Sequence, residues 1–297
     1  MAILYTSASG RDVRTHSYSA GHTFNECNRK FSLARRKGWR RREQKASFEF
    51  GKAIEDAIQY YHDDGMKTGT AVAKFGALWT PVQHATGLTY SKKEKNWTSV
   101  LDMGLELMWK YEEQFPSFGL SDIKFQLNYE KEVFPGDPTY GDLKFTAYID
   151  MHAKRNGCPI IVDIKTAAAS FPERPGMLRL DDQLRTYSWV TGVPDVAFLV
   201  FVKGKTPRVQ FLTDTVPEED RLEAGRIVGR DMVAIVEANK ADFFPKIPGV
   251  RFPNNHCTFC EMLGICTGDD KLRDEKLVNI SAMPTEKDWL DTLGEEE

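Results

Sequence analysis

A two-residue turn constrains this sequence more than any other feature. Asn156-Gly157 stands between two apolar runs in "LKFTAYIDMHAKRNGCPIIVDIKT", residues 143–166. The pair favours a β-hairpin, because a type I′ turn requires a positive φ at both of its central residues. Counting outward from this turn along the two strands places Asp150 directly opposite Asp163.

Two carboxylates that face each other within apolar strand sequence require a positive charge between them. Like charges across a ladder destabilise it, and a buried carboxylate costs more still. Mg²⁺ or Mn²⁺ would suit Asp150 and Asp163, because these ions prefer oxygen ligands, and the Ile164 carbonyl is a further candidate ligand. Lys165 points to the same face as Asp163 and is predicted to position water or stabilise the transition state of phosphodiester cleavage. The alternative is a frayed hairpin end with ordinary surface charges.

The remaining periodicity predicts helices and strands in mixed order. Apolar residues at helical spacing predict helices over 19–37, after Ser47, and over most of 68–115. Further along, the pattern predicts strands at 124–134, 143–154 and 159–166, a helix at 177–191, strands near 196–203 and 207–213, and a helix at 217–239. This order predicts an α/β fold in which helices flank a mixed β-sheet.

Composition and charge exclude some classes of protein. With 41% hydrophobic and 28% charged residues, the chain has the composition of a globular protein, and no apolar run approaches the length of a membrane span. Its N-terminus lacks the order of a signal peptide, and its five cysteines are an odd number. These features predict a cytoplasmic protein in a reducing compartment, prokaryotic or phage-encoded, with no membrane partner.

A basic run lies between Arg29 and Lys45, where nine Lys and Arg residues accompany one Glu. Most such runs are a solvated helix face, and the net charge of the whole chain is −3. This run is nevertheless dense enough to contact a phosphate backbone. The candidate nucleic-acid contacts are Arg35, Arg36, Arg40, Arg41 and Arg42.

Three of the five cysteines follow one another as Cys257-x2-Cys260-x5-Cys266. Thiolates at this spacing indicate a metal site, and such sites commonly have four ligands. Zinc and iron–sulfur clusters both accept four thiolates. His256 could replace one thiolate, although its position beside Cys257 makes joint binding awkward.

Several of these residues together resemble the RecB-type branch of the PD-(D/E)XK nucleases. Asp150 followed by Asp163-Ile164-Lys165 resembles the core motif, and "QLRTYSW" supplies Gln183 and Tyr187 in the pattern QxxxY. The resemblance implies a restriction-endonuclease-like fold, with these side chains lining an active site beside DNA.

A second motif of the same family is present with one change. "FGKAIED" resembles the segment Gly-x-x-x-His, and Glu55 takes the place of the histidine. The resemblance implies that Glu55 is a metal ligand. The alternative is a glutamate favoured by the dipole at a helix N-terminus.

The cysteines resemble those of the iron–sulfur subgroup of this branch, which includes AddB, a CRISPR-adaptation nuclease and single-strand exonucleases. That subgroup carries one cysteine on an early helix and three after the nuclease core. Cys27, Cys257, Cys260 and Cys266 match the arrangement. The resemblance implies a [4Fe–4S] cluster that joins the C-terminal segment to the N-terminal helix, with zinc as the competing metal. Cys158, in the hairpin turn, is expected to be a free thiol.

The resemblance implies a metal-dependent DNA exonuclease that acts on single strands or strand ends in recombination, repair or phage DNA processing. Trimming of CRISPR spacer ends and a non-catalytic DNA-binding scaffold subunit are the alternatives. "GKT" at 204–206 is not a P-loop, because its first glycine is absent and a strand follows, so a helicase or recombination partner would have to supply unwinding.

The predicted organisation has four parts. They are a helical region at 1–118, a nuclease core at 119–245, a cysteine-rich segment at 246–268 and an acidic tail at 269–297.

Overall fold

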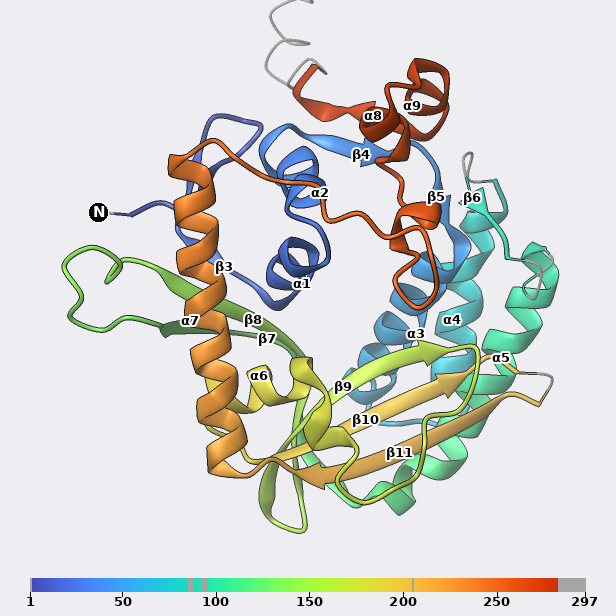
Figure 1. The fold of residues 1–297 in the computed structure, drawn as a ribbon. Coiled ribbons are helices and arrows are strands. Elements are labelled where there is room, and N and C mark those ends of the chain that lie inside the picture. Colours follow the sequence, from blue (N-terminus) through green and yellow to red (C-terminus); the bar gives the residue numbers. More distant parts are fainter. Residues whose placement is uncertain (1, 85–87, 92–93, 95, 205, 283–297) are drawn as a thin grey trace, which may run out of the picture. The chain divides into compact units, whose positions relative to one another are not determined.

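The computed structural model describes residues 2–84, 88–91, 94, 96–204 and 206–282 (Figure 1). Its α-helices are α1 Tyr18–Glu26, α2 Asn28–Phe31, α3 Ala46–Asp63, α4 Thr70–Trp79, α5 Trp97–Gln114, α6 Asp182–Thr191, α7 Glu218–Lys240, α8 Leu263–Thr267 and α9 Asp270–Lys276. The strands are β1 Tyr5–Thr6, β2 Asp12–Val13, β3 Thr15–His16, β4 Trp39–Arg41, β5 Gln44–Lys45, β6 Leu88–Thr89, β7 Leu120–Glu132, β8 Lys144–Arg155, β9 Cys158–Ala167, β10 Asp195–Val202, β11 Arg208–Thr215 and β12 Leu277–Asn279.

The chain divides into two compact units. The first unit comprises 1–43, 134–143 and 231–297, and the second comprises 44–133 and 144–230. None of the described helices is long and apolar enough to cross a membrane.

The sheet of the second unit runs in the order β11-β10-β9-β8, and β7 also pairs with β8. Strands β9 and β10 are parallel, whereas β10–β11, β8–β9 and β7–β8 are antiparallel. Parallel neighbours need a crossover connection, which α6 supplies between β9 and β10. The predicted mixed sheet with flanking helices is therefore confirmed.

The hairpin has the predicted turn and register. Asn156 and Gly157 have φ values of 52° and 83°, as a type I′ turn requires. Arg155 pairs with Cys158, and the ladder continues in step to Met151 opposite Val162.

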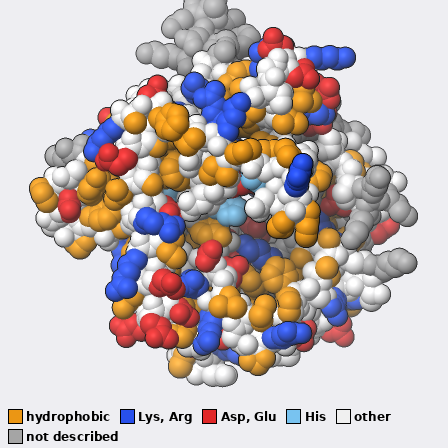
Figure 2. Space-filling view, in the orientation of Figure 1, with side chains coloured by type: hydrophobic (Ala, Val, Ile, Leu, Met, Phe, Trp, Pro, Cys, Tyr) orange, Lys and Arg blue, Asp and Glu red, His pale blue; other side chains and the backbone are white. Residues whose placement is uncertain are grey.

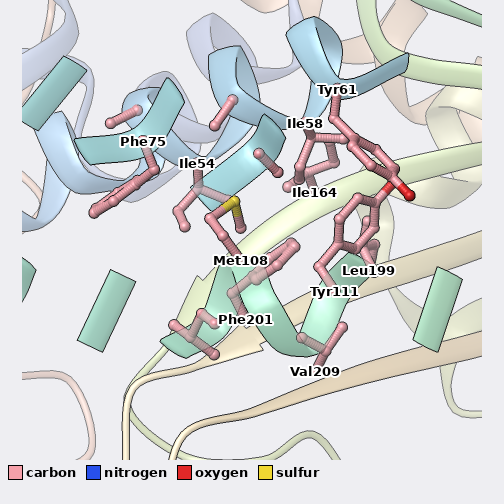
Figure 3. Close-up of a cluster of buried hydrophobic side chains, with 14 of the residues drawn as sticks. Ile54, Ile58, Tyr61, Phe75, Met108, Tyr111, Ile164, Leu199, Phe201 and Val209 are labelled. Atoms are coloured by element: carbon pink, nitrogen blue, oxygen red, sulfur yellow. The ribbon is translucent and has the colours of Figure 1, made fainter. Parts of the chain in front are cut away.

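Apolar side chains of three helices cover one face of this sheet. Ile54 and Ile58 of α3, together with residues of α4 and α5, pack against Ile164 of β9 and Leu199 of β10 (Figure 3). On the other face, Leu184 of α6 packs against alternate residues of β10. The α3 stripe at helical spacing and the period of two in the strands thus give the sheet two buried faces.

Helix α6 begins later than the predicted residue 177. A 3₁₀ turn occupies Leu178–Leu180, and the Asp181 carboxylate then caps the helix by accepting a hydrogen bond from the Leu184 amide at 2.9 Å. The cap places Gln183 in the first turn of α6. The helix ends at Gly192, whose φ is 77°.

The segment after β10 confirms that no P-loop is present. Strand β11 begins at Arg208, where a P-loop would require a helix. Residue 205, part of the "GKT" sequence, lies outside the described residues.

The predicted single helix over 19–37 is wrong, because the backbone leaves the helical conformation at Cys27. Cys27 is extended, with φ −164° and ψ 114°. The Asn28 side chain donates to the Phe24 carbonyl at 2.8 Å, and the Arg29 amide donates to the Pro245 carbonyl at 3.0 Å instead of to a helical carbonyl. Competition from these partners ends α1, and the chain continues as α2 and a π-helical turn at Ser32–Arg36.

We expect His62 of α3 to make the second unit sensitive to acid. Its Nε2 lies 2.7 Å from the Tyr111 hydroxyl, and burial lowers its pKa from 6.5 to about 4. Between these values the unfolded chain binds a proton that the folded chain does not, so the unfolding free energy falls as pH drops from about 6.5 to 4.

Urea unfolding at a series of pH values measures this loss. The native protein should lose about 2–3 kcal/mol more than His62→Gln over this interval. His22→Gln, which changes an exposed histidine of α1, is the matched control and should follow the native curve. Parallel curves for the native protein and His62→Gln would refute the assignment.

Candidate active site

The hairpin brings Asp150 and Asp163 to neighbouring positions on β8 and β9. The ladder between these strands stops at Met151 and Val162, one pair before the two aspartates. Here the Ile164 amide donates to Asp150 Oδ2 at 2.9 Å, so a carboxylate takes the place of a backbone acceptor. This hydrogen bond fixes the Asp150 side chain beside β9.

A chain of polar contacts links Asp163 to α6. Lys165 Nζ lies 2.6 Å from Asp163 Oδ2 and donates to Gln183 Oε1 at 2.9 Å. Gln183 Nε2 donates to Asp163 Oδ1 at 2.9 Å and also lies 2.8 Å from the Tyr187 hydroxyl. The predicted motif residues Asp163, Lys165, Gln183 and Tyr187 therefore lie together, because the Asp181 cap sets the start of α6.

Asp163 is buried, with only 1% of its side chain exposed. Lys165 Nζ, 2.6 Å from Oδ2, is the described partner of that oxygen, while Gln183 Nε2 donates to Oδ1 at 2.9 Å. A carboxylate oxygen has two lone pairs, so Oδ2 can also face a metal cation.

Three carboxylates share the electrostatic field of this region. Burial raises the pKa of Asp163 to about 7, with Lys165 opposing and Asp150 reinforcing the shift. Burial, followed by the charges of Asp150 and Asp163, raises the pKa of Glu55 to about 8. The pKa of Asp150 is also raised by burial, although the Ile164 amide and Lys165 lower it. Lys165 alone does not balance these carboxylates, which favours an added cation.

The donor set has the chemistry of a site for a hard divalent cation. Glu55, Asp150 and Asp163 offer carboxylate oxygens, the ligands that Mg²⁺ and Mn²⁺ prefer. In the part of the chain that the structure describes, no three His, Cys, Asp or Glu side chains are gathered closely enough to hold a metal ion. The types of these residues therefore suit a divalent cation, although their side chains are not gathered closely around one point.

A family model described as the PD-(D/E)XK nuclease superfamily matches residues 15–267. The chain belongs to this nuclease superfamily. Its members usually use divalent metal ions such as Mg²⁺ and act on DNA, and the predicted nuclease, a phosphodiesterase, is confirmed at the level of the superfamily.

One solved structure gives the fold further support, and a second is more weakly similar. One is the crystal structure of a "Putative exonuclease" from Eubacterium rectale, with a TM-score of 0.52, 15% identity, and coverage of 82% of this chain and 88% of the other. The structure of a protein named SSO0001 has a TM-score of 0.34, 13% identity, and coverage of 73% and 84%. No curated protein matches the chain.

Two residues near the nuclease site were missed in the sequence. The negative charge of Asp181 contributes to raising the pKa of Asp163, in addition to its role as the cap of α6. Phe198 of β10 lies under Lys165, with 5.9 Å between Nζ and the ring centroid. An aspartate three residues before Leu184 is a recognisable cap signal, whereas the contact with Phe198 depends on the parallel pairing of β9 and β10.

The four predicted cluster cysteines line one cavity of the first unit. This cavity, of about 70 Å³, is bordered by Cys27, Cys257, Cys260 and Cys266. All five cysteines of the chain are free thiols, and Cys158 is exposed in the hairpin, as predicted.

Backbone amides point at two of the cavity sulfurs. The Ile247 amide donates to Cys27 Sγ at 3.5 Å, and the Gly249 amide donates to Cys257 Sγ at 3.3 Å. Such donors stabilise a thiolate. His256 Nε2 lies 2.7 Å from the Ile247 carbonyl, so this ring nitrogen is already engaged.

The basic run does not form one helix face, because its residues are distributed over α2, the π-helical turn and β4. Arg36 pairs with Asp242 at 2.9 Å, and Arg41 pairs with Glu261 at 3.0 Å. Arg40 donates to the Ala34 and Trp39 carbonyls, and Arg42 donates to the Asp274 and Leu277 carbonyls. Burial lowers the pKa of His16 to about 4, and the charge of Arg35, at the same turn, lowers it further. DNA contact by these five arginines stays a prediction.

Proposed function

We propose that this nuclease is a Mg²⁺- or Mn²⁺-dependent DNA exonuclease acting on single strands or strand ends in recombination, repair or phage DNA processing. The observation that carries the proposal is the buried Asp163 carboxylate, which contacts Lys165 and shares its electrostatic field with Asp150 and Glu55. One lysine facing three carboxylates favours an added divalent cation, and carboxylates with raised pKa values gather at functional sites.

Asp150, Asp163 and Glu55, with the Ile164 carbonyl, would hold the metal ion. When bound, such an ion lowers the pKa of a water ligand and offsets charge on the phosphodiester. Lys165 supplies a cation at the same site, and its hydrogen bond to Gln183 fixes the direction of Nζ. The Gln183 amide is oriented in turn by its contacts with Asp163 and the Tyr187 hydroxyl. These side chains would position water and stabilise charge on the scissile phosphate.

End-labelled DNA tests the proposal. We expect Mg²⁺ or Mn²⁺ to support shortening of linear single strands from their ends, while circular single strands persist. Linear and circular duplexes are compared under the same conditions. Equal loss of circular and linear substrates would contradict the exonuclease assignment, and intact DNA in every sample would contradict the catalytic one.

Glu55→Gln should weaken metal binding more than it impairs turnover. Glutamine keeps the volume of Glu55 but removes one charge from the ligand set. We expect a requirement for about 10- to 100-fold more Mg²⁺, and a smaller loss of rate at saturating Mg²⁺. A Mg²⁺ titration of the initial rate measures both. Glu113→Gln on the exposed side of α5 is the matched control. An unchanged Mg²⁺ requirement would remove Glu55 from the site.

We also infer that Cys27, Cys257, Cys260 and Cys266 hold a [4Fe–4S] cluster. The four thiols line one cavity, two of their sulfurs accept backbone amide hydrogen bonds, and Lys246 also borders the cavity. Burial raises the pKa of Cys260 and of Cys266, with Lys246 opposing the shift of Cys266, so the bound metal itself would displace their protons.

Anaerobically purified protein is therefore expected to be brown, with broad absorbance at the blue end of the visible range. Elemental analysis should find about four iron atoms and equal sulfide for each chain. Stoichiometric zinc without iron would replace the cluster by a zinc site, and protein free of both metals would contradict metal binding by the four cysteines.

A further inference from the structure

The segment 243–260 of the first unit displays three phenylalanines to solvent, of which Phe243 is 67% exposed. Phe252 and Phe259 are 89% and 77% exposed, more than any other large hydrophobic side chain that the structure describes. Val250 and Ile247 of the same segment are 68% and 38% exposed. Several exposed apolar side chains within one short segment favour an interaction surface.

The segment holds these rings in place by its own contacts. The Cys257 amide donates to the Gly249 carbonyl at 2.9 Å, and Arg251 forms a β-bridge with Asn254. A Cβ on Gly249 would lie 2.4 Å from the His256 ring, so the chain crosses itself closely here. The backbone that carries Phe252 is thus closed by hydrogen bonds between 249 and 257, and Phe259 follows two residues after this closed loop.

The charge of this segment suits a polyanion. Residues 243–260 include Lys246, Arg251 and His256 but no Asp or Glu, although the whole chain has a net charge of −3. Arg251 directly precedes Phe252, is exposed, and makes no ion pair with any described acidic residue. Figure 2 shows hydrophobic side chains interleaved with Lys or Arg where Figure 1 draws this segment.

Single-stranded nucleic acid has two kinds of group that complement this surface. Its bases have free faces on which aromatic rings stack, and its phosphates are negative. In a duplex the same faces are covered by neighbouring bases. We propose that Phe252 and Phe259 form a stacking surface for bases of single-stranded DNA, with Arg251 facing its phosphates. This inference rests on the proposed function and specifies how the substrate strand is recognised.

Fluorescence anisotropy tests the stacking surface directly. The full chain with Asp163→Asn, which should not degrade the probe, is titrated with a labelled oligothymidylate of about 15 nucleotides. We expect the added double substitution Phe252→Ala, Phe259→Ala to raise the Kd at least about 10-fold. Phe252→Trp with Phe259→Trp should restore binding, because tryptophan also stacks. Trp109→Ala, which removes a 54% exposed aromatic of α5, is the matched control.

An abasic oligonucleotide of the same length separates stacking from charge and from folding. It keeps the phosphates but has no bases, so the double substitution should change its Kd by less than about twofold. An equal weakening on both probes, or unchanged affinity for oligothymidylate, would overturn the inference. Loss of a dimer in the double variant, with unchanged DNA binding, would assign the surface to a second protein copy. Cleavage assays on the protein with its native Asp163 test the proposed function separately.

Discussion

Asp163→Asn is expected to abolish DNA cleavage while preserving the fold. Asparagine keeps the volume of the side chain and an oxygen that can accept from Gln183, but it removes the buried charge beside Asp150 and Glu55. We expect the rate to fall by at least about 10²- to 10³-fold. Initial rates on end-labelled single strands measure the loss. Asp102→Asn, at an exposed position of α5, makes the same chemical change away from the site and should leave the rate unchanged. A variant that cleaves at the native rate would refute the site.

The same substitution should stabilise the metal-free protein at alkaline pH. The folded chain holds a proton on Asp163 up to a pKa of about 7, whereas the ordinary value is 3.8, so the unfolding free energy falls as pH rises between these values. The deficit is fully present above about pH 7 and absent below about pH 4. In EDTA the variant should melt above the native protein at pH 8 and equal to it near pH 4. Thermal unfolding monitored by circular dichroism measures both, and equal melting temperatures at pH 8 would contradict the buried charge.

Cys27→Ser is expected to remove the brown colour of the protein and to destabilise the C-terminal segment of the first unit. Serine is a poor ligand for iron, so one corner of the proposed cluster is lost, and with it a tie between residues more than 200 positions apart. We expect a loss of several kcal/mol in unfolding free energy and rapid proteolysis within 246–268. Cys158→Ser, at the exposed thiol of the hairpin, should change neither colour nor protease resistance. Retained colour and resistance in Cys27→Ser would contradict the role of Cys27.

The parts of the fold that sequence patterns predict well are those governed by local rules. Asn156 and Gly157 determine their own turn, and the turn determines the register, because strand pairing extends outward from it. Gln183 and Tyr187 need only helical spacing to share a face with each other. The contact of Gln183 with Lys165 follows once α6 crosses between β9 and β10.

The parts that were missed depend on partners distant in sequence. The break at Cys27 arises where the Arg29 amide meets the Pro245 carbonyl, a contact that no local spacing indicates. The basic run suggested a solvent-facing helix, yet Arg36 and Arg41 pair with Asp242 and Glu261. Local charge density does not distinguish arginines that face a ligand from arginines that hold the protein together. The exposure of Phe252 and Phe259 likewise depends on the conformation of their segment, which no sequence pattern indicates.

The discontinuity of the first unit has a consequence during translation. Residues 44–230 emerge before residues 231–297, so the nuclease unit can fold while the first unit still lacks its third segment. Cys266 follows Cys27 by 239 residues, a delay on the order of 10 s or more at ordinary elongation rates. During that time Cys27 is a thiol without its three neighbours. Completion of the four-cysteine cavity is therefore a late step in the synthesis and folding of the chain. Before this step, we expect the Cys27 thiol of the nascent chain to be most open to oxidation.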